Sequence, residues 1–114
     1  MAITGAHAIL YTSQAEELRA VLKDVLGFEH VDAGGGWLIF RLPPAEIAVH
    51  PGDKPAHEFT FMCDDIAATM DELRAKGVEF SGEPENQGWG VTTTMQLPGG
   101  LEVMLYEPRH PTLS

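Results

Sequence analysis

The chain has 114 residues, 44 % of them hydrophobic, and a net charge of −10 from 17 acidic against 7 basic side chains. This balance disfavours nucleic acids and anionic membranes as partners, because both bind clustered basic residues. The apolar runs are too short to cross a bilayer, the first residues lack a signal-peptide pattern, and the single Cys63 cannot form an internal disulfide. We therefore expect one domain over residues 1–114, located in the cytoplasm, with neither a nucleic acid nor a membrane as partner.

The first half of the chain predicts a strand, a helix and three further strands. Residues 6–12 favour a strand, and residues 13–26 predict a helix because apolar side chains recur at three- and four-residue spacing. Ser13 and Glu16 have the spacing of a capping box, and Gly27 provides a helix stop. Further strands are expected at residues 28–31, 37–42 and 46–50, between turns rich in glycine and proline.

The second half repeats this order, which predicts two copies of one βαβββ module. Asp64 or Asp65 is expected to cap the second helix, which ends at Gly77. The strands of this half are expected at residues 59–63, 78–80, 91–96 and 101–106. The boundaries are module 1 at 5–50, a linker at 51–56, module 2 at 57–108 and a tail at 109–114. The predicted fold class is α+β, with the two modules forming a curved mixed sheet around a cavity and the helices on its outer face.

Side chains alternate between the two faces of each expected strand. In the second module Phe59 and Phe61 share one face, which we assign to the helix, while Glu58 and Met62 lie on the other. His7 likewise lies opposite the helix-facing side chains of the first strand. The faces that carry His7 and Glu58 are therefore expected to line the cavity.

Five short motifs follow one another along nearly the whole chain. They are His7 at the start of a strand, Leu-Gly-Phe at 26–28, Asp-Asp-Ile at 64–66, and the stretches 73–80 and 97–108. In this order they resemble the vicinal oxygen chelate superfamily, which includes glyoxalase I, bleomycin-resistance proteins and extradiol dioxygenases. The resemblance implies paired βαβββ modules, and in the enzymes of the superfamily the cavity holds a metal.

The resemblance also implies where a divalent metal (Zn, Ni, Fe or Mn) would be bound, since its ligands come from the first and last strands of each module. Carried over by position, these ligands fall on His7, Glu58, Ala48 and Met104. Glu46 and Glu102 share strand faces with the last two positions, but two residues or roughly 6–7 Å along the strand. That shift exceeds a coordination bond of about 2 Å. We therefore expect no cofactor, with a metal on His7 and Glu58, and Glu46 or Glu102 as extra ligands, as the alternative.

Trp37 and Trp89 each follow a glycine and occupy comparable places in the two modules. Aromatic rings can stack on a flat ligand and methionines adapt to its shape, although most buried tryptophans pack in a core or at a subunit contact. The side chains expected to contact a ligand are His7, Tyr11, Trp37, Glu58, Met62, Trp89, Met104 and Tyr106. Two alternatives remain open, in which His7 and Glu58 form a metal-free polar pair or His7 lies at the rim. No residue is assigned a catalytic role.

These features predict a small-molecule-binding protein of the glyoxalase/bleomycin-resistance type that holds an apolar or aromatic ligand in the cavity without a metal. The alternative is a divalent-metal-dependent lyase, isomerase or dioxygenase, in which the metal polarises substrate oxygens. A third possibility is a structural module whose own side chains fill the cavity. A short chain buries little core alone, and members of the superfamily often pair or exchange modules, so we expect a homodimer.

Overall fold

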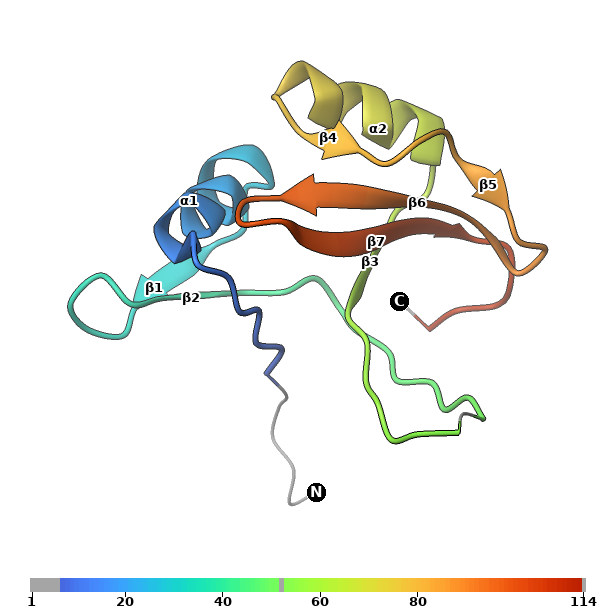
Figure 1. The fold of residues 1–114 in the computed structure, drawn as a ribbon, viewed down its shortest axis with the longest axis horizontal. Helices are drawn as coiled ribbons and strands as arrows, with labels where there is room; N and C mark the ends of the chain where they lie inside the picture. The colour runs from blue at the N-terminus through green and yellow to red at the C-terminus, as the bar shows by residue number, and fades with distance from the viewer. Residues whose placement is uncertain (1–6, 52, 114) are drawn as a thin grey trace.

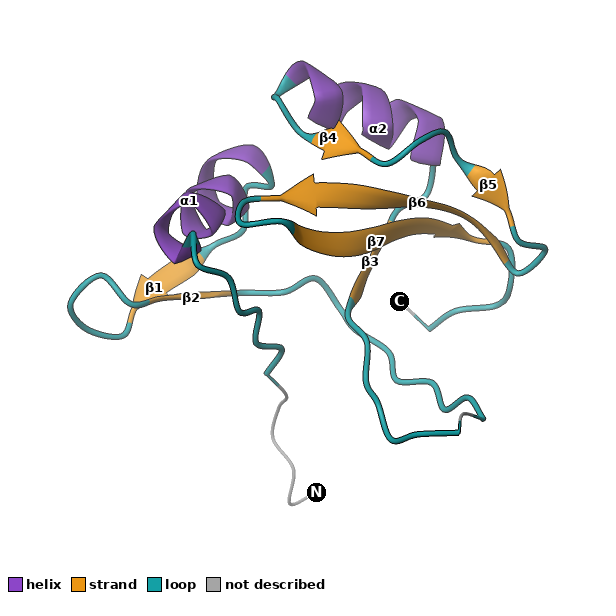
Figure 2. Cartoon of the chain, viewed as in Figure 1, coloured by secondary structure: helices purple, strands orange, loops and turns teal. Residues whose placement is uncertain are grey.

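The computed structural model describes residues 7–51 and 53–113. Its elements in chain order are α1 (Ala15–Ala20), the π-helical turn η1 (Val21–Val25), β1 (His30–Asp32), β2 (Leu38–Phe40), β3 (Thr60–Met62), α2 (Ile66–Ala75), β4 (Glu79–Phe80), β5 (Glu85–Asn86), β6 (Gly90–Leu97) and β7 (Leu101–Pro108). Two α-helices and a mixed sheet form an α+β fold (Figures 1 and 2), which confirms the predicted fold class.

The larger sheet holds the strands of the second module in the order β3-β7-β6-β4, with β5 also paired to β6. β3 runs parallel to β7, and the other pairs are antiparallel. At its centre the hairpin of β6 and β7 is paired along its whole length, from Gly90↔Pro108 to Leu97↔Leu101. Among the described residues, the first module contributes the two-stranded antiparallel sheet of β1 and β2.

Both helical segments pack on the same face of the larger sheet. α2 buries Ile66, Met70 and Leu73, which recur at three- and four-residue spacing and form one stripe. α1 adds Leu18 to the same cluster, and the half-buried side chains of η1 pack beside it. The sheet supplies the remaining buried apolar side chains, which are Val78, Met95, Leu97, Val103 and Leu105. The core therefore lies between the helices and the second-module sheet.

α2 begins at a cap that joins the helix to the end of β7. The Asp65 carboxylate accepts a hydrogen bond from the Ala68 amide at 3.1 Å, which decides between the two predicted caps in favour of Asp65. The Ile66 amide donates to the Glu107 carboxylate at 3.0 Å, and Arg109 lies 2.8 Å from the same carboxylate. The Ile66 amide, followed by the Arg109 guanidinium, holds the pKa of Glu107 below its usual range.

α1 begins differently from its prediction. It starts after Gln14, and within the described part of the chain no side chain caps it. The Thr12 hydroxyl donates to the Pro98 carbonyl at 2.9 Å and accepts from the Gln14 amide at 3.2 Å. The predicted capping box of Ser13 and Glu16 is therefore wrong, because Thr12 is held by the β6–β7 turn and supplies the local hydrogen bond instead.

Two strands expected in the first module are not formed. Residues 7–12 and 46–50 belong to no strand, and in Figure 1 both segments leave the layered part of the molecule. Backbone amides and carbonyls form a ladder only where another strand lies alongside. In the single copy, neither segment pairs with another described residue as a strand, so these two strand predictions are wrong for the isolated chain.

Candidate ligand-binding face

Among the described residues, both helical segments cover one face of the larger sheet and none covers the other, which we call the open face. Alternation along β6 and β7 turns Met95, Val103 and Leu105 towards the helices, so the side chains between them point the opposite way. The strand register then assigns to the open face the side chains Thr60, Met62, Thr92, Thr94, Gln96, Glu102, Met104 and Tyr106.

The register brings three of the predicted ligand-contacting residues together on this face. Met62 of β3 is paired with Tyr106 of β7, which is paired in turn with Thr92 of β6. The next row holds Thr60, Met104 and Thr94 in the same order. Side chains opposite one another in paired strands lie within about 5.5 Å at their Cβ atoms. Met62, Met104 and Tyr106 therefore form one contiguous surface flanked by threonine hydroxyls.

Trp89, which directly precedes β6, extends this surface. Its ring meets the Tyr106 ring edge-on, with the centroids 5.6 Å apart and the planes at 75°. The Arg109 amide donates to the Trp89 carbonyl at 2.9 Å, which fixes the backbone at this position, and the indole remains half exposed. The His110 ring lies 6.2 Å from Tyr106. The sequence around His110 carries no signal for this contact, because a proline-containing tail gives no sign that it turns back on the sheet.

Polar side chains of the open face form hydrogen bonds with one another and with neighbouring residues. Gln87 donates from its amide to the Thr92 hydroxyl at 3.2 Å. Gln96 is paired in register with Glu102, and its amide donates to the Glu102 carboxylate at 2.6 Å and also to the Ser81 hydroxyl. The Glu102 carboxylate is therefore engaged by an amide, two residues along β7 from Met104.

The other predicted ligand-contacting residues lie elsewhere in this copy. His7 and Glu58 are exposed and lie outside the helices and strands, before α1 and before β3 respectively, and Tyr11 is exposed as well. Trp37 stands at the β1–β2 turn, where the Arg19 guanidinium lies 4.8 Å from the centre of its ring. The β1–β2 and β5–β6 turns are at opposite ends of the molecule (Figure 1), so the two tryptophans do not share one surface.

The residues suggested for a metal do not assemble in one copy. Across residues 7–51 and 53–113, no three His, Cys, Asp or Glu side chains are grouped so that they could hold an ion. The Glu46 carboxylate accepts a hydrogen bond from the Leu113 amide, and Glu102 is held by Gln96. The position in β7 that the resemblance assigns to a ligand carries the Met104 thioether. The donors present in the single copy therefore do not fit a catalytic metal.

Cys63, which follows β3, has the properties of a core thiol. Burial raises its pKa, and its sulfur donates to the Tyr106 carbonyl at 3.7 Å. A raised pKa leaves little thiolate at neutral pH, which is the reactive form.

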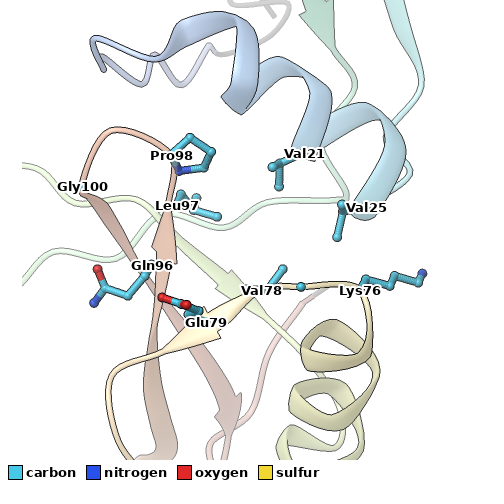
Figure 3. A pocket seen from close by; sticks show the side chains of 10 residues that line it. Val21, Val25, Lys76, Val78, Glu79, Gln96, Leu97, Pro98 and Gly100 are labelled. Carbon is cyan, nitrogen blue, oxygen red and sulfur yellow. The ribbon is translucent and has the colours of Figure 1, made fainter.

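Two cavities lie on the helix-facing side of the fold. The first cavity has a volume of about 380 Å³ and lies between η1 and the start of β4. Its apolar lining includes Val21, Val25, Val78 and Leu97 (Figure 3). The other, of about 230 Å³, lies beside the C-terminal end of η1 and touches Met62. Of the predicted ligand-contacting residues, Met62 alone touches either cavity. Both cavities therefore lie at the contact between the helical segment of the first module and the second module.

The fold and the strand order place the chain in a known class. A family model for the Glyoxalase/Bleomycin resistance protein/Dioxygenase superfamily matches residues 5–108, and the chain belongs to this superfamily. Within the described residues, no helix is long and apolar enough to span a membrane.

Several solved structures are similar to this chain. TnmS3, an antibiotic binding protein from Streptomyces sp. CB03234, is 23 % identical with a TM-score of 0.67, over 95 % of this chain and 98 % of that one. A superfamily member from Sphaerobacter thermophilus is 25 % identical with a TM-score of 0.64, over 93 % and 98 % of the two chains. A lactoylglutathione lyase from Agrobacterium tumefaciens is 17 % identical with a TM-score of 0.54, over 90 % and 95 %.

One curated relative matches part of the chain. The uncharacterized protein YetH of Bacillus subtilis is 36 % identical over 47 residues, which cover 41 % of this chain and 39 % of YetH. The match therefore spans about two fifths of each protein.

Proposed function

We propose that this protein binds an apolar or aromatic small molecule on the open face, without a resident metal. The observation that carries the proposal is the contiguous surface of Met62, Met104 and Tyr106, with the Trp89 ring packed edge-on against Tyr106. Superfamily membership and the antibiotic-binding function named for TnmS3 also support a small-molecule ligand.

The chemistry of the open face suits such a ligand. An indole and a phenol ring offer flat apolar area at little cost in side-chain entropy, while two thioethers adapt to irregular shapes. The Thr60 and Thr94 hydroxyls flank Met104 in the same row and can orient a polar group of the ligand. A thioether at Met104, where a metal enzyme needs an oxygen or nitrogen donor, supports binding without a metal.

Tryptophan fluorescence tests this proposal directly. The chain has two tryptophans, so a Trp37→Phe background leaves Trp89 as the only indole reporter. Titration with planar aromatic compounds such as acridine or naphthol should quench or shift its emission with saturation. In this background Tyr106→Ala should weaken binding at least about fivefold, because an aromatic contact contributes ~1 kcal/mol beyond the area it buries. Tyr106→Phe, which keeps the ring, should bind nearly as the background does.

Two outcomes would overturn the proposal. Equal affinities of Tyr106→Ala and Tyr106→Phe for the aromatic compound would show that it does not bind on the open face. Stoichiometric Zn, Ni, Fe or Mn in natively purified protein, lost on His7→Ala, would replace it with the metal-dependent lyase, isomerase or dioxygenase.

We further propose that the protein acts in the cytoplasm as a homodimer. Cys63 is partly buried and unpaired, which agrees with a reducing compartment. The exposed apolar side chains of Ile47 and Val49 support the pairing of two copies.

A further inference from the structure

The C-terminal tail adds a third ring to the aromatic end of the open face. β7 ends at Pro108, and the Arg109 amide donates to the Trp89 carbonyl, so the tail begins alongside the residue that precedes β6. The His110 ring lies 6.2 Å from the Tyr106 ring with the two planes at 34°, and the Trp89 ring meets the same phenol ring edge-on. His110 therefore lies beside the surface on which an aromatic ligand would pack.

The hydrogen bond of the His110 ring decides which of its two nitrogens carries the proton. Nδ1 lies 2.9 Å from the Pro111 carbonyl oxygen. A carbonyl oxygen can only accept, so Nδ1 carries the hydrogen and donates it. In the neutral imidazole Nε2 is then an acceptor. His110 is exposed, and no hydrogen bond among the described residues involves Nε2. The tail thus offers an accepting nitrogen next to the aromatic rings.

The hydroxyls of the open face cannot select between ligands that donate and ligands that accept. Thr60 and Thr94 each carry a hydroxyl, which can do both. A neutral imidazole whose Nδ1 is already engaged can only accept at Nε2. His110 is therefore the group at this end of the face that distinguishes a hydroxyl from an ether.

The charges around the open face disfavour an anionic ligand. None of the side chains that the strand register assigns to this face is basic, and Glu102 is among them. The Arg109 guanidinium, next to His110 in the chain, lies 2.8 Å from the Glu107 carboxylate. The whole chain carries a net charge of −10, which repels anions. A neutral ligand that donates a hydrogen bond fits these surroundings better than a carboxylate does.

We infer that His110 is a specificity-determining residue of the open face and that the ligand is a neutral hydroxyaromatic compound. Its ring packs on Tyr106, and its hydroxyl donates to His110 Nε2. The inference rests on the proposed function, since it requires an aromatic ligand beside Tyr106, and it adds the polar group that this ligand carries.

Two ligands that differ in the hydroxyl proton test the inference in the Trp37→Phe background, with Trp89 as the reporter. Naphthol donates a hydrogen bond, whereas its methyl ether can only accept. In mildly alkaline buffer, which keeps imidazoles neutral, naphthol should bind about fivefold more tightly than the ether. His110→Phe keeps a ring beside Tyr106 but removes the acceptor, so the two compounds should then bind equally. His50→Phe, at an exposed position outside the strands, should keep the preference.

Nitrogen NMR of the His110 imidazole gives a second measurement, which needs no substitution at this residue. Nδ1 should carry the proton in the free protein, and the Nε2 signal should move towards that of a hydrogen-bonded nitrogen with naphthol but not with the ether. A proton on Nε2, equal affinities before the His110 change, or a naphthol preference that survives His110→Phe would each overturn the inference but not the proposed function. Absence of saturable binding by either compound would overturn the proposed function, and this inference with it.

Discussion

The two modules share one order of elements, but a single copy completes only the second. Val103 and Leu105 of β7 are buried between a helix layer and two neighbouring strands, whereas their counterparts Ile47 and Val49 stand in solvent. The side chains of the two pairs are similar in size and hydrophobicity, so composition does not explain the difference. Strands are stabilised mainly by cross-strand contacts and packing, and the second module has these contacts within one chain.

Truncation of equivalent side chains should reveal the largest difference in stability between the two modules. Leu105→Ala removes a buried core side chain and should lower the free energy of unfolding by about 2–5 kcal/mol. Val49→Ala removes an exposed one and should change it by less than about 0.5 kcal/mol. Urea unfolding at a protein concentration low enough to keep the chain monomeric measures both. Equal losses for the two variants would show that residues 46–50 are packed within the monomer.

A smaller effect is expected at the contact that joins the modules. A Cβ added to Gly99 would lie 1.7 Å from the Thr12 hydroxyl oxygen and displace its hydrogen bond to Pro98, whereas at Gly100 it would meet no atom within 4 Å. Both glycines have positive φ, +84° and +76°, so alanine at either costs about 1–2 kcal/mol of backbone strain. Gly99→Ala should lose roughly a further 0.5–1.5 kcal/mol for the hydrogen bond.

Thermal unfolding of Gly99→Ala and Gly100→Ala, with hydrogen exchange in α1, checks this prediction. Gly99→Ala should speed exchange in α1, because Thr12 anchors the segment that leads into this helix, while Gly100→Ala should not. Identical melting temperatures for the two variants would mean that the turn moves aside without loss.

Sequence patterns were sufficient where contacts are local or lie within the second module. The cap at Asp64 or Asp65 and the stop at Gly77 predicted the bounds of α2, and alternation correctly placed Met62 on the face opposite Phe61. The open-face role of Met62, Met104 and Tyr106 in ligand binding stays a prediction. Patterns were insufficient where a distant segment decides the outcome. The Thr12 contact with Pro98 spans 86 positions, and no local signal at Ser13 reveals it.

The first-module strands are a second case of the same limit. Residues 46–50 have good strand composition, yet a strand also requires a neighbouring strand, and the local sequence does not reveal whether one lies alongside. Trp37 and Trp89 likewise each follow a glycine and directly precede a paired strand, but of the two only the Trp89 ring meets Tyr106. Similar local sequences in the two modules therefore have different spatial neighbours, which the local sequence does not reveal.

The charge at Glu107 should make a smaller contribution to stability. Its carboxylate joins the start of α2 to β7, whereas among the described residues no side chain caps α1. Glu107→Gln keeps an acceptor for the Ile66 amide but removes the charge that Arg109 and the start of α2 favour. Because the pKa of the Glu107 carboxyl is lowered in the folded state, its contribution is fully present above the unfolded pKa. It is lost as pH falls through the folded pKa.

The melting temperature of Glu107→Gln should therefore lie below that of the wild type at neutral pH, and the two should converge in acid, below the folded pKa of Glu107. Glu83→Gln, at an exposed loop position, should melt with the wild type at neutral pH. A Glu107→Gln deficit that stays constant from neutral to acid pH would assign the effect to side-chain geometry, because an uncharged interaction has no reason to weaken as carboxylates are protonated. A difference in melting temperature that shrinks towards acid pH would assign the effect to the charge of Glu107, and so to the electrostatic interaction between β7 and the start of α2.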